Sequence, residues 1–213
     1  MRPAAAFFGV RERPAPARAA AEPERCELCA TPIGRDHGHV VDLEQRGLRC
    51  TCRACYLLFT HEGAAGGRWR AVPDRYLHDP DFRLDHAQWD ALQIPVRTAF
   101  LFRNSALGRW VAFYPSPAGA TESLLELAAW DDVLAANPRL PPVAPDVEAL
   151  LLHARPGGFG CFLVPIDACY ELVGLVRLHW KGFDGGEEVW RELDAFFERL
   201  RARSRALDPG QPA

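Results

Sequence analysis

The chain has 213 residues, of which 48% are hydrophobic and 25% charged, and its formal net charge is −3. This is the composition of a globular protein without the basic field that attracts nucleic acid, so we expect no nucleic-acid partner. No apolar run approaches the roughly 18 residues of a spanning helix, so we expect no membrane contact and a cytoplasmic protein.

Four segments differ in composition. Residues 1–24 are rich in Ala, Pro and Arg, and we expect them to form a disordered tail, as we do residues 206–213. Residues 25–62 contain five of the seven cysteines and are the expected metal-binding module, because clustered cysteines in a reducing compartment are typical of metal ligands. Residues 63–205 mix strand and helix patterns without regular alternation, which predicts a mixed α+β domain.

Two Cys-x2-Cys pairs stand near the ends of the module: Cys26 with Cys29, and Cys52 with Cys55. Each pair presents two sulfurs to one metal from a tight turn, and four thiolates make a closed tetrahedral site. The residues between the pairs can form a hairpin, and those after Cys52 a short helix. This order predicts a treble-clef-like or zinc-ribbon-like module that binds zinc, with a rubredoxin-like iron site as the alternative.

Three further side chains of the module are candidate ligands. Cys50 stands two residues before Cys52, so in an extended chain both point to the same face. We therefore expect Cys50 beside the site, as an alternative ligand, a supporting thiol or a redox-sensitive neighbour. His37 or His39 could instead replace one cysteine and give a Cys3His site.

The Asp36–His37 step between the cysteine pairs partly resembles the phage-type endonucleases of the His-Cys or HNH class. In those enzymes an Asp-His step on a hairpin activates water beside a catalytic cation. The chain departs from that pattern, because Tyr56 and Leu57 stand where an Asn is expected and the net charge is negative. We therefore rank an HNH-like nuclease last among the functional hypotheses.

Three short elements follow the module: a strand over 67–72 (GRWRAV), a polar connector over 73–84 (PDRYLHDPDFRL) and a helix over 85–93 (DHAQWDALQ). Asp85 is the expected N-cap of that helix. Two runs of β-branched and aromatic residues come next, separated by SALG. They predict a hairpin of strands over 96–104 and 109–116.

Small residues over 116–122 (SPAGATE) indicate a loop. Ser123 stands three residues before Glu126, a capping-box spacing that predicts a helix over 124–137. The apolar run over 147–155 (VEALLLHAR) favours a helix, with a strand as the alternative.

The last third of the chain predicts a buried strand over 160–166 (GCFLVPI) and a helix over 168–180. Asp184 and Glu187 have a second capping-box spacing ahead of an amphipathic helix over 188–204. The apolar stripe of this helix consists of Val189, Leu193, Phe196, Phe197 and Leu200.

Several stretches together resemble a known family of bacterial proteins: CELC, CRACYLLF, AVPDRY, QIPV…FLFRNS, VAFYPSPAGATESLLEL and CFLVPIDACYELVGLVRLHWKGFDGG. The resemblance runs from Arg25 to the region of Ser204. The family is frequent in high-GC genomes and often encoded among [NiFe]-hydrogenase structural and maturation genes, and it has no established activity or catalytic residue. The resemblance implies a setting in hydrogenase assembly or maturation, with a hydrogenase subunit or maturation factor as partner.

We therefore expect a non-catalytic zinc-binding accessory protein that supports hydrogenase assembly or maturation through protein contacts. The alternative is a redox protein that transfers electrons through an iron-thiolate centre.

Overall fold

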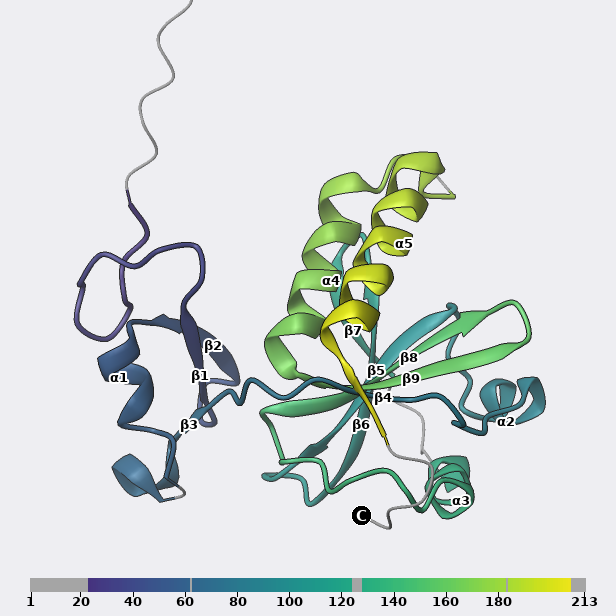
Figure 1. Cartoon of the computed structure of the whole chain (residues 1–213), viewed down its shortest axis with the longest axis horizontal. Helices are drawn as coiled ribbons and strands as arrows, with labels where there is room; N and C mark the ends of the chain where they lie inside the picture. The colour runs from purple at the N-terminus through teal and green to yellow at the C-terminus, as the bar shows by residue number, and fades with distance from the viewer. Residues whose placement is uncertain (1–22, 62, 124–127, 183, 208–213) are drawn as a thin grey trace, which may run out of the picture.

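The computed structural model describes residues 23–61, 63–123, 128–182 and 184–207. It has two parts, a small sheet with one short α-helix and a larger sheet with helices on both faces (Figure 1). The protein is thus α+β, with a cysteine-rich N-terminal module ahead of a sheet-rich domain, as the sequence predicts. Apart from a few residues at their inner ends, the two expected tails lie outside the described residues. No helix among the described residues is long and apolar enough to cross a membrane.

The N-terminal module is built on a three-stranded antiparallel sheet of order β2-β1-β3. Its elements in chain order are β1 (Gly38–Asp42), β2 (Gly47–Thr51), α1 (Arg53–Leu57), the 3-10 turn η1 (Ala64–Gly67) and β3 (Trp69–Ala71). The β1–β2 hairpin connects the two cysteine pairs. Because β3 pairs with β1, the module's sheet continues beyond residue 62, where the sequence indicated a change of domain.

The larger part is built on a seven-stranded sheet of order β10-β4-β9-β8-β5-β6-β7. Its strands are β4 (Leu77–Asp79), β5 (Thr98–Asn104), β6 (Arg109–Ser116), β7 (Gly119–Ser123), β8 (Glu148–Arg155), β9 (Gly158–Pro165) and β10 (Arg205–Ala206). β10 joins β4 in parallel, and the other pairs are antiparallel.

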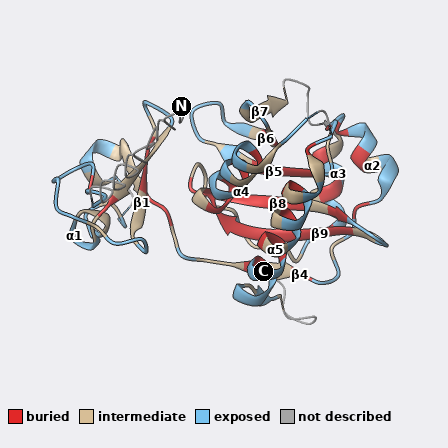
Figure 2. Cartoon of the chain, turned by 90° about the horizontal axis from the view of Figure 1, so that it is seen from above, coloured by how far each residue is buried: buried red, intermediate tan, exposed pale blue. Residues whose placement is uncertain are grey.

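Helices cover both faces of this sheet. They are α2 (His86–Ala91), α3 (Ala128–Ala136), α4 (Ile166–His179) and α5 (Gly186–Arg203). Along β8, Leu151 belongs to the apolar layer beneath α4 and α5, whereas Leu150 and Leu152 belong to the layer beneath α2 and α3. Figure 2 shows that much of the central strands β5, β8 and β9 is buried.

Several sequence predictions are confirmed. The hairpin is β5 and β6, the short strand is β3, and the buried strand lies in β9. Asp85 caps α2 and accepts a hydrogen bond from the Gln88 backbone N–H at 2.7 Å. The last two helices are α4 and α5, and all five residues of the α5 stripe are buried.

Other predictions were wrong. The run over 147–155 forms strand β8, the alternative, because strand side chains that are buried on both sheet faces leave no alternation to read. The expected loop over 116–122 contains most of β7, and the expected connector over 73–84 contains β4; each gains its strand conformation from pairing with β6 or β9.

The outcome differs for the two other expected capping boxes, Asp184 with Glu187 and Ser123 with Glu126. The N-cap of α5 is Gly185, with a φ of 88° and no capping side-chain hydrogen bond among the described residues, so the Asp184–Glu187 prediction was wrong. Ser123 ends β7, and Glu126 lies outside the described residues.

The module packs against the α4 side of the larger sheet. Val41 of β1 and Val72, which follows β3, belong to the same buried apolar cluster as the inner faces of α4 and α5. A cleft of about 700 Å³ opens beside this contact. The module contributes His37 and His39 to its lining, and the domain contributes Asp167 at the start of α4.

Candidate metal centre

The first cysteine pair lies on a tight turn. The Ala30 N–H donates to the Cys26 carbonyl and the Cys26 N–H donates to the Thr31 carbonyl, each at 2.8 Å. Ala30 takes a φ of 61°, which lets the chain reverse directly after Cys29. The turn therefore directs both sulfurs of the pair to one side.

The second pair lies where β2 passes into α1. Cys52 is the N-cap of α1, with φ −69° and ψ 162°, and its carbonyl accepts a hydrogen bond from the Tyr56 N–H at 2.9 Å. Cys55 stands in the single turn that follows. Glu27 ties the two segments together, because its N–H donates to the Cys50 carbonyl at 2.9 Å and its carboxylate accepts from the Cys50 N–H at 2.6 Å.

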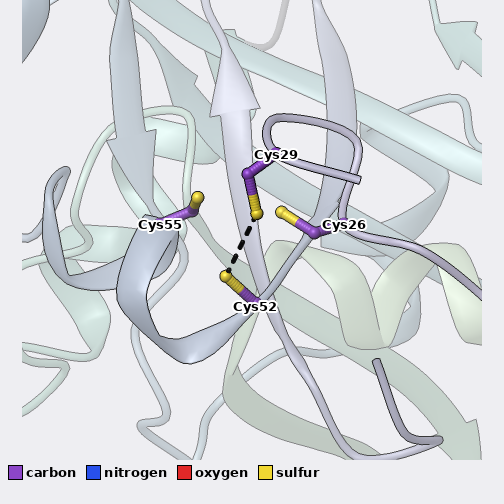
Figure 3. A group of neighbouring side chains, drawn as sticks. All are labelled: Cys26, Cys29, Cys52 and Cys55. Carbon is purple, nitrogen blue, oxygen red and sulfur yellow. Dashed lines mark hydrogen bonds between the residues drawn. The ribbon is translucent and has the colours of Figure 1, made fainter. Parts of the chain in front are cut away.

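The four sulfurs of Cys26, Cys29, Cys52 and Cys55 converge on one point, and all lie within 4.8 Å of one another (Figure 3). Cys29 Sγ and Cys52 Sγ are 3.7 Å apart. A tetrahedral site with metal–sulfur bonds of 2.3 Å needs about 3.8 Å between sulfurs. All seven cysteines of the chain lie in the described residues and are free thiols. The donor set therefore fits a metal ion.

The thiols of this cluster differ in how readily they ionise. Hydrogen bonds from the Thr31 side chain and backbone, and then from neighbouring thiols, lower the pKa of Cys29 to about 6. Burial raises the pKa of Cys55 to about 12, and its hydrogen bonds to the other sulfurs act in the same direction. Burial also opposes ionisation of Cys26, but hydrogen bonds from backbone N–H groups outweigh it and lower its pKa. The cluster thus holds negative charge that a cation can neutralise.

Helix α1 contacts the rest of the module through side chains that are only partly buried. None of its five residues, all of which the structure describes, is buried. Tyr56 provides its main contact with the sheet: its hydroxyl donates to the Val72 carbonyl at 2.9 Å, and its ring covers Gly38. A Cβ at Gly38 would lie 2.6 Å from the Tyr56 ring, so this contact requires glycine. This contact could not be predicted from local spacing, because only the fold brings the two residues together.

The structure gathers the three additional candidates in a second group. One ligand atom each of His37, His39 and Cys50 lies within 4.8 Å of the other two. Cys50 is the register partner of His39 in the β1–β2 hairpin. Burial raises the pKa of the Cys50 thiol to about 11, and the carboxylates of Glu24 and Glu27 add to this.

Asp167 is a residue of this region that sequence analysis did not identify. Its Oδ2 lies 2.8 Å from Nδ1 of His39, although the two residues are 128 positions apart. Nothing local in the sequence marks such a pair. Asp36, which the nuclease hypothesis requires, is exposed beside the same cleft.

The remaining two cysteines are inert. Cys161 of β9 and Cys169 of α4 are 1% and 0% exposed, and burial raises the pKa of both thiols well above the usual range. A buried neutral thiol behaves as a small apolar side chain.

No curated protein and no solved structure matches the chain. A match to a family profile spans residues 25–204, and so includes all seven cysteines and both parts of the fold. The chain belongs to the family of unknown function DUF5947.

Proposed function

We propose that the four-thiol centre holds one structural zinc ion, and that the protein is a non-catalytic accessory factor whose zinc module forms a protein-binding surface. The observation that carries this proposal is the convergence of the four sulfurs from two separate turns. Four thiolates fill the coordination of zinc, and a filled site stabilises the fold and leaves no position for a substrate.

Iron in the same tetrahedron is the alternative, and it would make the protein an electron carrier. Ala30 and Tyr56 stand directly after the second cysteine of each pair, where rubredoxin-like sites usually carry glycine. This difference favours zinc.

Exposed leucines on the module support a protein partner. Leu28 lies between the first two cysteines and is 37% exposed, while Leu57 and Leu58 at the end of α1 are 51% and 66% exposed. These side chains lie on the two segments that the metal would join, so the ion would fix their positions. Apolar side chains held at a surface are typical of contact sites for proteins.

The resemblance described above supplies the setting that we propose for this partner. Hydrogenase assembly or maturation would require contact with a hydrogenase structural subunit or a maturation factor, and the exposed leucines offer such a contact. The arginine-bearing N-terminal segment, which lies outside the described residues, is a second part of the proposed surface.

The metal is tested by elemental analysis and an absorption spectrum of protein purified without air. We expect colourless protein with bound zinc, and we expect Cys29→Ser to lose that zinc. Visible charge-transfer bands from an iron-thiolate centre would overturn the zinc assignment and favour the redox alternative.

The partner is tested by co-purification from the native host with two leucine variants. Leu58→Asp places a charge on the module, whereas Leu178→Asp places one on α4, where the leucine is 73% exposed. Neither should change stability by more than about 0.5 kcal/mol, because both positions face solvent. We expect a hydrogenase subunit or maturation protein to co-purify with the wild type and Leu178→Asp, and to be lost with Leu58→Asp.

Deletion of the gene should lower hydrogenase activity without lowering the transcript. Unchanged hydrogenase activity would sink the accessory role. Metal-dependent DNA cleavage that disappears in His37→Ala would replace it with the nuclease hypothesis.

A further inference from the structure

We propose that His37, His39 and Cys50 form a second metal site, separate from the four-thiol centre. It would bind a d-block cation of the zinc type through two imidazole nitrogens and one thiolate. One ligand atom of each residue already lies within 4.8 Å of the other two. This inference depends neither on the partner proposed above nor on the metal in the four-thiol centre.

The backbone places these three side chains together. His39 and Cys50 are directly opposite each other in the β1–β2 hairpin, so their Cβ atoms lie on one face of the sheet. His37 precedes His39 by two residues, and the centroids of the two rings are 4.8 Å apart. Two imidazoles and a thiol thus share one small region at the edge of the module.

The hydrogen bonds of His37 prepare it as a ligand. Its Nδ1 lies 2.8 Å from the Gly34 carbonyl, which can only accept, so Nδ1 carries the proton. Nε2 of the neutral ring is then left with a lone pair. This atom is buried and has no hydrogen-bond partner among the residues that the structure describes. An unpartnered buried lone pair is unfavourable unless a cation or another donor occupies the space in front of it.

His39 is held in the same tautomer by a different group. Its Nδ1 lies 2.8 Å from Asp167 Oδ2, and both side chains are about three-quarters buried, with exposed fractions of 25% and 26%. A carboxylate accepts the Nδ1 proton, which leaves Nε2 free to bind a metal. Metal-binding histidines commonly have such a carboxylate on the other ring nitrogen, because it orients the ring and makes it a better donor. Asp167 is therefore a positioning residue.

The surroundings favour a cation of borderline softness. Glu27 contacts the Cys50 backbone, and its carboxylate and that of Glu24 place negative charge near the Cys50 thiol. Imidazole and thiolate donors suit zinc and neighbouring d-block ions, whereas magnesium and calcium prefer oxygen ligands.

This second site would differ chemically from the four-thiol centre. Three protein ligands leave one coordination position open, as in zinc sites that bind water or a ligand. His37 and His39 both line the cleft of about 700 Å³ between the module and the domain. A fourth ligand, such as water, can therefore reach the metal from the cleft.

The test counts zinc ions. Metal-free protein is reloaded with excess zinc without air, freed of unbound ion and subjected to elemental analysis. We expect two equivalents in the wild type and one in each of His37→Gln, His39→Gln and Cys50→Ala. The matched control His61→Gln changes an exposed histidine of the same module and should keep two.

The remaining equivalent in these variants should disappear when Cys29→Ser is added. Asp167→Asn should weaken the second equivalent about 10- to 100-fold and leave the first unchanged, because it removes only the orienting carboxylate. A wild type whose zinc is all lost with Cys29→Ser would overturn the proposal, and so would two equivalents in the His37→Gln and His39→Gln variants.

Imidazole 15N resonances keep the proposal testable if a variant does not fold. In the wild type, the second equivalent of zinc should shift the Nε2 resonances of His37 and His39 and leave those of His61 in place. Unshifted Nε2 resonances at two equivalents would contradict the proposed ligands.

Discussion

The two parts of this protein differ in how many apolar side chains they bury. Among the described residues up to Ala71, the buried apolar side chains are few: Cys26, Val40, Val41 and Ala71. The domain, by contrast, has an apolar layer on each face of its seven-stranded sheet. A small segment that cannot build a sufficient core needs a metal or a disulfide, whereas a larger one does not. From this difference we infer that a metal held by the cysteine cluster stabilises the module, whereas apolar burial stabilises the domain.

Within the module, β1 is better supported by packing than the segments that carry the cysteines. β1 contributes Val41 to the domain's core and is flanked by two partner strands. The turn around Cys26 and helix α1 contribute no residue to the domain's buried clusters, and none of the α1 residues is buried. Loss of the metal should therefore affect the segments that carry the cysteines more than the strand between them.

Breaking the four-thiol centre should have the largest effect. Cys26→Ser removes a ligand that is 2% exposed, and structural zinc contributes on the order of 10 kcal/mol of apparent binding free energy. We expect elemental analysis to find this metal lost while the domain's melting temperature changes little. The control Cys161→Ala truncates a buried side chain of β9 and should lower the domain's stability by about 1 kcal/mol with the metal retained. Cys26→Ser protein that keeps as much metal as the wild type would contradict the contrast between the two parts.

The ion pair between Arg75, whose side chain is 41% exposed, and the buried Glu148 of the domain should give the next largest effect. Glu148 is 1% exposed, and its carboxylate accepts hydrogen bonds from Arg75 Nε at 2.7 Å and Nη2 at 2.6 Å. Arg75→Ala leaves this carboxylate without its cation, which should cost about 3–5 kcal/mol of unfolding free energy. Denaturant unfolding measures this loss, and the metal content should stay the same.

The exposed pair of Arg203 and Asp74 serves as the control for that experiment. Their atoms are 2.7 Å apart, but the side chains are 58% and 76% exposed. Arg203→Ala should cost less than about 1 kcal/mol. Equal losses in the two arginine variants would mean that burial does not decide the strength of these pairs.

A smaller effect on the free energy of unfolding is expected from protonation of His153, whose side chain lies between the sheet and α5. Its ring stacks on Phe197 at 4.0 Å and its Nδ1 is hydrogen-bonded to the Thr98 hydroxyl at 2.8 Å. Burial, aided by the charges of Arg97 and Arg155, lowers its pKa from 6.5 to about 4.

The folded protein therefore favours neutral His153, while the unfolded chain takes up a proton below pH 6.5. The stability that neutral His153 contributes is fully present above pH 6.5 and is lost as the pH falls toward 4. It amounts to about 2 kcal/mol after allowance for partial exposure. Unfolding free energies of the wild type and His153→Gln, measured across this window, should converge at low pH. A constant difference between them would show that protonation of His153 does not affect folding.

The features that could be predicted from the sequence are those that depend on local residue spacing. The two Cys-x2-Cys pairs, the capping role of Asp85 and the apolar stripe of α5 each depend on residues a few positions apart, and the structure bears out the arrangement of each. Strand β8 was predicted only as the alternative to a helix. Successive residues such as Leu150 and Leu151 are buried on opposite faces, which gives an apolar run without a period.

At the site, the features that could not be predicted depend on contacts between residues that are far apart in the sequence. His39 was a candidate ligand, but its link to Asp167 joins the module to the first turn of α4, and only the packed structure brings them together. The grouping of Cys50 with the two histidines depends on the register of the β1–β2 hairpin. The sequence indicated the hairpin, but it did not indicate which residues stand opposite each other.

The most direct test of the central claim is hydrogen exchange of the wild type before and after chelation. With metal removal verified by elemental analysis, we predict that residues 25–36 and 50–61 lose protection. β1 should lose less, and the amides of β8 and β9 should keep theirs. Unchanged protection around the cysteines, or an equal loss across the whole chain, would contradict the claim that a metal stabilises the module and apolar burial stabilises the domain.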